Sequence, residues 1–185
     1  MVRAGEDVQR LCFLVSGTLG LETTADDHSY CVVEKLQAPW LLQPDALFGY
    51  NTRYMHTVRT LSEAHFITLS KDEVLRLLDD FLIIRLNLLN ILSTYSQRIT
   101  RQPWHTAPRT LQERIVRFFI NHSVYPAGEK DFFILMKQLA LEVGDTRLNV
   151  SRVLNHLQSQ RLLTLGRGCI HIPSLEYIIM SQVDE

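Results

Sequence analysis

The stretch QLALEVGDTRLNVSRVLNHLQ, residues 138–158, decides the fold of the carboxy-terminal half of this chain. Apolar residues recur at helical spacing on both sides of a Gly-Asp-Thr break, which predicts two helices joined by a tight turn. Ala140 stands where the second helix would cross the first, and Gly144 stands at the turn. The apolar residues that would form the shared core are Leu139, Val143, Val150, Val153, Leu154 and Leu157. This spacing predicts a helix-turn-helix unit, although an ordinary helical hairpin could show it too.

The polar face of the second helix indicates what such a unit would contact. The candidates in its first two turns are Thr146, Arg147, Asn149, Ser151 and Arg152. In the DNA major groove arginine can pair with guanine and asparagine with adenine, while hydroxyl groups suit phosphates. We therefore predict that this face binds DNA, with a solvated helix face as the alternative for a single arginine. Lys137 and Gln138, at the start of the first helix, are further candidate contacts.

A hairpin is predicted directly after these helices. The segment RLLTLGRGCIHIP, residues 161–173, reads as two short strands around Gly166-Arg167-Gly168. A wing of this kind would place Arg167 near a neighbouring phosphate. Residues 137–167 hold five basic and two acidic residues, which is enough for a basic face if the acids point away. Binding through phosphates should then weaken steeply with salt.

The charge of the chain is divided unevenly between its halves. Among its 185 residues, 19 basic and 20 acidic side chains almost cancel. Residues 1–95 hold 8 basic and 12 acidic residues, whereas residues 96–185 hold 11 basic and 8 acidic residues. The second half is the positive one, as expected for the half that would contact DNA.

The cysteines and the hydropathy pattern indicate where the protein works. Cys12, Cys31 and Cys169 are odd in number and widely spaced, which argues against a disulfide framework and against a structural zinc site. No apolar run approaches the roughly 20 residues needed to cross a bilayer, and the first residues lack the apolar core of a signal peptide. We expect a soluble protein of the reducing cytoplasm without a membrane partner.

The first seventy residues predict short strands separated by turns. The strand candidates are LCFLV, TLGLETT, SYCVVEKL, MHTVRTL and AHFITL. Their spacing predicts a small antiparallel barrel or sandwich, with Gly17 supplying turn geometry that a side chain would obstruct. From Lys71 the pattern changes to one long helix, for which Ser70 is the expected N-cap and Glu73 completes a capping box.

The predicted long helix is apolar on more than one face. One stripe would face the barrel, and the other would need separate cover, which a second copy of the helix can provide by a two-fold contact. The candidate dimer contacts are Leu75, Leu78, Leu82, Leu89 and Leu92. A helix buried wholly within one chain is the alternative. Pro103 and Pro108 then interrupt the helical pattern and predict a hinge, so the expected domains are residues 1–70, 71–102 and 103–185.

This order of elements resembles the Crp/Fnr superfamily of bacterial transcription regulators. The resemblance rests on KQLALEVGDTRLNVSRVLNHL, followed by RLL and GRGCIHI. Over residues 5–95 it is weaker and rests on AGED, FLVSGTLGL and AHFITLSKDEVLRLL. It implies an α+β fold with an N-terminal antiparallel β-roll, or barrel, like that of cyclic-nucleotide-binding domains, a long dimerisation helix and a C-terminal winged helix-turn-helix. We expect the β-roll to be incomplete, because the family usually has a helix and early strands before the A-G-E turn.

The resemblance also implies a function and its residues. It implies a homodimer that reads a two-fold symmetric site on double-stranded DNA and works with RNA polymerase. Arg147 and Arg152 match the family's two recognition arginines, and Thr146 matches its hydroxyl residue at the helix start. Leu148 stands where the best-known members have a glutamate that accepts from cytosine. An apolar side chain can only pack or touch a thymine methyl group, so the DNA site should differ.

The resemblance leaves the effector open. Members that bind cyclic nucleotides carry G-E-L followed by an R-S or R-T pair, whereas the matching segments here are LLQPDALF, residues 41–48, and Met55-His56-Thr57. Pro44 also removes one amide donor, so we predict that cyclic nucleotides do not bind. Clustered cysteines for an iron-sulfur cluster are missing. Haem held by His28, His56 or His65 stays an alternative, but we predict no cofactor and no metal ligand.

Two other classes of function are alternatives to DNA binding. A winged helix can serve as a protein-interaction module without binding DNA. An enzyme would need a nucleophile elbow, a phosphate-binding loop or a metal-binding histidine motif, and the sequence holds none of these. We therefore predict that the protein has no catalytic residues.

Overall fold

The computed structural model describes residues 2–101, 104 and 106–181. Unit 1 comprises Met1–Leu19 and Gln37–Thr106, and unit 2 comprises Gly20–Leu36 and Ala107–Glu185. Gly20–Leu36 groups with the carboxy-terminal unit because strand β3 (Cys31–Gln37) pairs with strand β7 (Lys130–Phe133). The domains expected from the sequence were continuous segments of the chain, whereas each of these units contains two separate segments. Pro103, where the hinge was predicted, lies outside the described residues.

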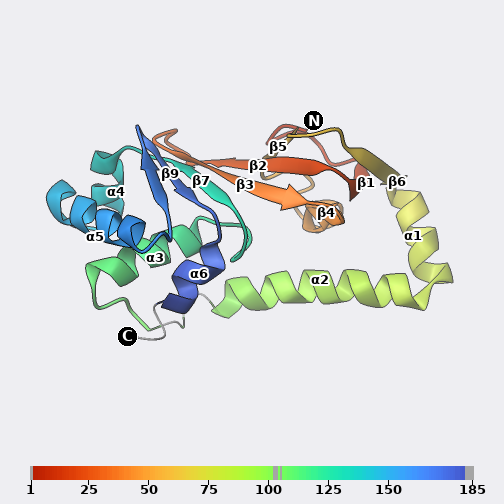
Figure 1. The fold of residues 1–185 in the computed structure, drawn as a ribbon. Helices are drawn as coiled ribbons and strands as arrows, with labels where there is room; N and C mark the ends of the chain where they lie inside the picture. Colours follow the sequence, from red (N-terminus) through yellow and green to blue (C-terminus); the bar gives the residue numbers. More distant parts are fainter. Residues whose placement is uncertain (1, 102–103, 105, 182–185) are drawn as a thin grey trace. The chain divides into compact units, whose positions relative to one another are not determined.

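Unit 1 is built on a three-stranded antiparallel sheet (Figure 1). Its strands, in spatial order, are β4 (Trp40–Leu42), β1 (Arg10–Ser16) and β6 (His65–Ser70). Unit 1 also contains a short strand β5 (Thr57–Thr60), which lies outside this sheet, and a 3-10 turn η1 (Pro44–Ala46). The core residues of this unit are Val8, Leu11, Ala46, Leu47, Tyr54 and Val74. The predicted strands are confirmed, including the role of Gly17, whose φ is 101° and where a Cβ would collide with the Glu63 carbonyl.

Two helices follow where one long helix was predicted: α1 (Lys71–Asp80) and α2 (Leu82–Arg101). The capping box is confirmed, because Ser70 Oγ accepts from Glu73 N and Glu73 Oε2 accepts from Ser70 N. The single helix is wrong because Phe81 is extended, with φ −124° and ψ 99°. Arg85 stabilises this break by donating to the Leu78 and Asp79 carbonyls, which are left without helical partners at the end of α1. None of the described helices could cross a membrane, since each is too short or too polar.

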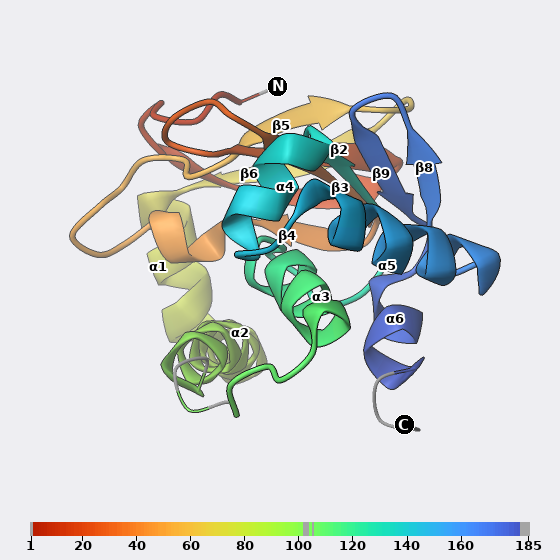
Figure 2. The same cartoon turned by 90° about the vertical axis from the view of Figure 1, so that its left-hand side faces the viewer.

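Unit 2 packs helices against an antiparallel sheet (Figure 2). Its helices are α3 (Leu111–Asn121), α4 (Met136–Glu142), α5 (Arg147–Ser159) and α6 (Leu175–Ser181). Its strands run in the order β2 (Thr18–Thr24), β3, β7, β9 (Cys169–Ile172) and β8 (Thr164–Gly166). Fully buried side chains of the core include Phe119, Phe132, Leu139, Val150, Leu154, Leu157, Leu163 and Ile172. Burial of this many large apolar groups is the main stabilising contribution to the unit.

A buried ion pair joins β3 to β7. Lys130 Nζ lies 2.9 Å from Glu34 Oε2, and both side chains are 1% exposed. Glu34 also accepts from the amides of Val124 and Tyr125, and Lys130 donates to the Ala127 carbonyl. Charges taken out of water need such partners, because an unpaired buried charge is costly. The strand β7 and this pair were both missed from the sequence, where Lys130 lies within the turn-rich segment SVYPAGEKD, residues 123–131.

Candidate nucleic-acid interface

The helix-turn-helix forms as predicted. The turn between α4 and α5 places Gly144 at φ 63°, a conformation that costs glycine little and other residues more. Asp145 N donates to the Ala140 carbonyl across this turn. The predicted core residues Leu139, Val143, Val150, Leu154 and Leu157 are buried, and Val153 is half-buried against them. The apolar side of α5 is thus fully used inside unit 2, and only its other side can serve a partner.

Asp145 organises the start of α5. Its carboxylate accepts from Asn149 Nδ2 at 2.9 Å, from Thr146 N at 2.8 Å and from Arg114 Nη2 of α3 at 2.6 Å. The Asn149 hydrogen bond above all holds the pKa of Asp145 below its usual range, so the carboxylate stays ionised. Sequence reasoning missed this residue, although an Asp directly before a Thr N-cap was a usable signal. Because Arg114 pairs with it, Asp145 adds little negative charge to the exposed face.

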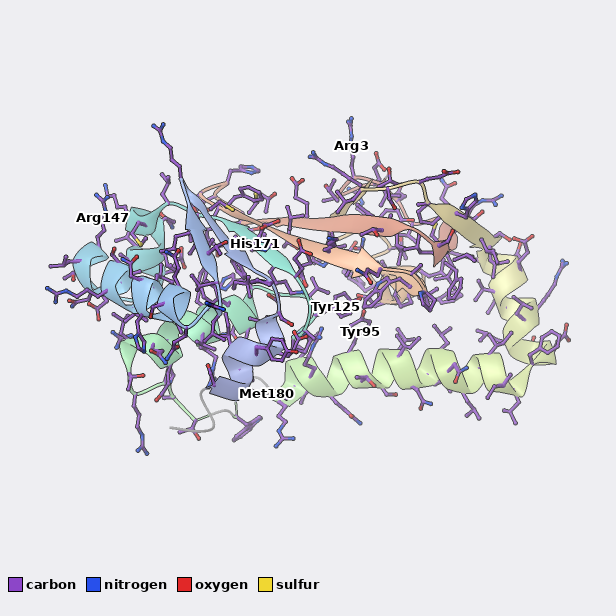
Figure 3. The ribbon with its side chains drawn as sticks, viewed as in Figure 1. Arg3, Tyr95, Tyr125, Arg147, His171 and Met180 are labelled. Carbon is purple, nitrogen blue, oxygen red and sulfur yellow. The ribbon has the colours of Figure 1, made fainter. Side chains whose placement is uncertain are left out.

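The candidate residues of α5 lie on its exposed side. Thr146 is the N-cap, and its hydroxyl accepts from Asn149 N at 3.3 Å. Thr146, Arg147, Asn149 and Arg152 are exposed, whereas Ser151 is half-buried. Figure 3 labels Arg147 at the amino-terminal end of α5. Leu148 is 61% exposed and lies between the two arginines on the helix surface. The structure therefore brings two cations and one apolar side chain together on one face.

The first helix contributes less than expected. Lys137 is exposed at the start of α4. Gln138 is half-buried, and its Nε2 donates to Glu142 Oε1 at 2.8 Å. Asp145 and Glu142 are the two acidic residues of the segment 137–167. The contact with Gln138 occupies one carboxylate oxygen of Glu142. Lys137 is therefore the more accessible of the two candidates on α4.

The predicted wing is present and is attached to α5. Strands β8 and β9 pair antiparallel, from Thr164↔His171 to Gly166↔Cys169. Arg167 is exposed at the tip, followed by Gly168 with φ 71°. Leu165 N donates to Gln158 Oε1 of α5 at 2.8 Å. This bond ties the hairpin to the end of α5, so the wing keeps a defined position beside that helix.

The side chain of Gln43, directly after β4 in unit 1, contacts the backbone of Met55 and His56. Gln43 is buried, and its Oε1 accepts from Met55 N at 2.8 Å and from His56 N at 3.1 Å. Its Nε2 donates to the His56 carbonyl. Two amide donors that could otherwise bind an anion are therefore occupied within the chain.

Helix α2 carries apolar residues on two sides. One side, with Ile84, Leu88 and Ile91, lines a cavity of about 620 Å³ together with residues of β1, β4, β6 and α1. Leu82 and Leu89 lie on the opposite side, 63% and 52% exposed. The remaining candidate dimer contacts are placed differently: Leu92 is half-buried, and Leu75 and Leu78 lie on α1. The expected stripe is therefore not continuous, because Phe81 separates the two helices and Leu78 faces the cavity.

Comparison with known protein families gives a match over the first part of the chain. Residues 1–81 match the family model of the cyclic nucleotide-binding domain. This match covers β1–β6 and α1 and does not include β7–β9, α2 or the helix-turn-helix. No curated protein matches the sequence significantly.

Solved structures resemble the fold over a longer range. The c-di-GMP responsive global regulator CLP from Xanthomonas campestris has a TM-score of 0.52 at 21% identity, over 92% of this chain and 87% of that chain. FixK2 from Bradyrhizobium japonicum has a TM-score of 0.50 at 11% identity, over 96% and 89%. A transcriptional regulator from Thermotoga maritima has a TM-score of 0.51 at 14% identity, over 56% and 80%. At such identities the likeness shows the fold alone, and it agrees with the predicted α+β class.

Proposed function

We propose that this protein is a homodimeric, sequence-specific DNA-binding transcription regulator of the Crp/Fnr type. The observation that carries the proposal is the exposed face of α5, where Arg147 and Arg152 project from a helix held rigidly by its buried side. The capped amino terminus of α5 and the attached wing support it. Two solved structures that share the fold, CLP and the Thermotoga maritima protein, are described as regulators and agree with it.

Some residues of this face would contact DNA bases, and others would contact phosphates. Arg147 and Arg152 would donate to guanine in the major groove, and Leu148 would touch a thymine methyl group. Asn149 donates to Asp145, so its carbonyl oxygen would accept from adenine unless that bond opens. The residues proposed to contact the sugar-phosphate backbone of the DNA are Thr146, Ser151, Lys137, Gln138 and Arg167.

Dimerisation would use the side of α2 that points away from the cavity. Leu82 and Leu89 are one heptad apart and exposed, and a two-fold copy of the same helix would cover them. A dimeric reader of this kind would bind two half-sites about 34–36 Å apart, one with each α5. Cytoplasmic location and contact with RNA polymerase belong to the same proposal, as does the absence of catalysis.

We further propose that cyclic nucleotides are not the effector, although the family model of residues 1–81 is named for them. Gln43 occupies the two amides of the loop, and Pro44 has no amide hydrogen to donate. Haem is not favoured, because no histidine in the described part of the chain lines the apolar cavity of unit 1. The effector, if one exists, stays open.

Selection of the purified protein against randomised duplex DNA, at near-physiological salt and without added effector, tests the function. Enrichment of an inverted repeat with half-sites about one helical turn apart is the expected result. Enrichment of a single unrepeated site would contradict the dimer, and enrichment of nothing would contradict the proposal that the unliganded protein reads DNA.

A further inference from the structure

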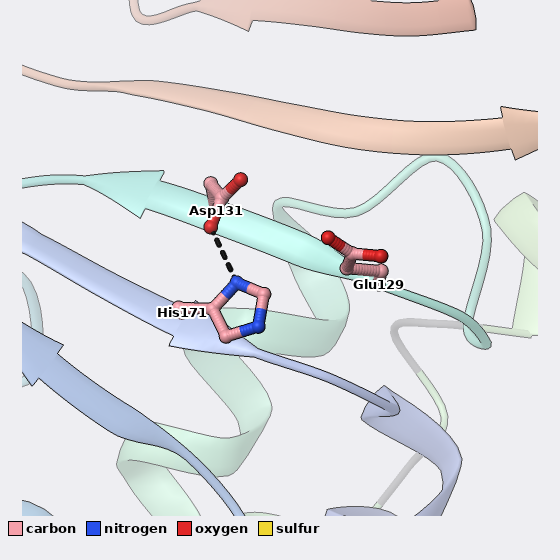
Figure 4. A group of neighbouring side chains, drawn as sticks. All are labelled: Glu129, Asp131 and His171. Carbon is pink, nitrogen blue, oxygen red and sulfur yellow. Dashed lines mark hydrogen bonds and ion pairs between the residues drawn. The ribbon is translucent and has the colours of Figure 1, made fainter. Parts of the chain in front are cut away.

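A cluster of three side chains able to bind a metal lies on the sheet of unit 2 (Figure 4). Lys130 and Phe132 of β7 are buried, so Asp131 between them points to the other face of the sheet. Asp131 pairs with His171 on β9 in the antiparallel register. Glu129 precedes Asp131 by two residues and shares its face. Three metal-ligating groups therefore gather on one surface: Asp131 on β7, His171 on β9 and Glu129 directly before β7.

The distances within this cluster suit a shared ion. His171 Nδ1 lies 2.7 Å from Asp131 Oδ1, and one ligand atom from each residue lies within 4.8 Å of the other two. Zinc binds such atoms at about 2.0–2.2 Å, which places neighbouring ligands about 3–3.5 Å apart. Small rotations of half-exposed side chains close that difference.

The charges around the cluster favour a cation. Two carboxylates held this close repel each other, more strongly at a half-buried position than in water. Lys35 Nζ lies 3.0 Å from Glu129 Oε2 and offsets one negative charge from the β3 side. A divalent ion between Glu129, Asp131 and His171 would offset the remaining charge, with Lys35 bonded to the outer oxygen of Glu129.

We propose that Glu129, Asp131 and His171 form a binding site for a divalent transition-metal ion, with Zn²⁺ as the ion that one imidazole and two carboxylates suit. Water would complete the coordination. His171 binds the ion in its neutral form, so any proton it carries is released to solvent. The ion would link β9, the second strand of the wing, to β7.

The neighbouring thiols do not fit the site as ligands. Neither Cys31 nor Cys169 belongs to the group whose ligand atoms lie within 4.8 Å of one another. The expected donor set is therefore nitrogen and oxygen only. Sequence analysis predicted no metal ligand because His171 is separated from the two carboxylates by about forty residues.

Metal titration of the full chain tests this proposal. The metal-stripped protein would be titrated with Zn²⁺ in competition with a chromogenic chelator, and with Mn²⁺, which carboxylates suit and thiolates do not. We expect one ion per chain for the wild type and for His65→Ala, which removes an exposed histidine of unit 1. His171→Ala and Asp131→Asn should each weaken binding by more than the roughly 10–100-fold that outer-shell changes cost.

The outcomes separate a site from an ion-pair network. Absence of stoichiometric binding, or unchanged affinity in His171→Ala, would overturn the proposal, as would loss of binding only in Cys31→Ser or Cys169→Ser. Asp131→Asn keeps the shape of the side chain and so tests the ligand even if His171→Ala folds poorly. Zn²⁺ should also raise the Tm of the wild type and not of Asp131→Asn. None of these readouts uses DNA, so they test the metal site independently of the proposed function.

Discussion

Helices α5 and α2 show how differently two helices of one chain satisfy their apolar residues. In α5 the apolar side chains Val150, Leu154 and Leu157 are buried within unit 2, and the other side is polar apart from Leu148. In α2 not one residue of Leu82–Arg101 is buried, although apolar side chains occupy two sides of the helix. A helix with complete internal cover can present its polar face to a charged partner, whereas one without cover needs an apolar partner. This difference agrees with the proposed function, in which α5 binds DNA and α2 binds a second copy of the chain.

The largest expected effect concerns the internal cover of α5. Leu154→Ala should lower the free energy of unfolding by about 2–5 kcal/mol, because it leaves a cavity in a well-packed core. Leu82→Ala on α2 should change the unfolding of the monomer little, since that side chain is exposed. Denaturant unfolding at low protein concentration measures both. Equal losses would contradict the contrast between the two helices.

The next effect concerns the partner of α2. The double variant Leu82→Lys/Leu89→Lys should convert the proposed dimer into a monomer, because burying each leucine contributes about 1.5–3 kcal/mol and a buried lysine opposes it. Sedimentation velocity measures the mass. Thr94→Lys, well away from this stripe on the helix surface, is the control and should stay dimeric. A dimer that survives the double variant would show that another surface joins the copies.

A smaller effect concerns the DNA sequence that α5 reads. Leu148→Glu should shift the preferred base pair beneath α5 towards one that presents a cytosine amino group, with a discrimination of about 1–3 kcal/mol. Competition binding with duplexes that differ at one position measures it, with Leu148→Ala as the variant that lacks the new acceptor. The same preference in wild type and Leu148→Glu would mean that residue 148 does not face the bases.

The smallest effect is expected in the loop of unit 1. Saturating cyclic AMP should leave the Tm unchanged, because Gln43 already occupies the Met55 and His56 amides. A ligand present at a hundred times its Kd would add about 2.7 kcal/mol, which a thermal shift assay detects readily. Such a shift would show that the Gln43 contacts open to admit a nucleotide.

Features that depend on residues close together in the sequence could be predicted from it. The helix-turn-helix was predictable because Ala140, Gly144 and Val150 lie within eleven residues of one another and act through local spacing. The capping box of Ser70 and Glu73 is local in the same sense. Both are set by neighbours along the chain, so a pattern of residue types is sufficient to find them.

The features that were missed depend on distant partners or on a specific side-chain contact. Glu34 and Lys130 are far apart in sequence, and only the β3–β7 pairing makes them a buried ion pair. The same pairing moves Gly20–Leu36 into unit 2. The break at Phe81 is stabilised by the reach of Arg85 back to Leu78, which apolar periodicity does not register. Tertiary pairing overrides local pattern in the first two cases, and a single side-chain contact does so at Phe81.

The measurement that tests the central claim most directly is equilibrium binding of a selected inverted-repeat duplex by the wild type and by Arg147→Ala/Arg152→Ala, with a scrambled duplex as reference. Both arginines are exposed, so the double variant should fold, and its unfolding curve would be recorded beside the binding data. We predict that the preference for the selected site falls at least about 30-fold, as loss of two base contacts of about 1–3 kcal/mol each requires. An unchanged preference would contradict the claim that α5 reads DNA.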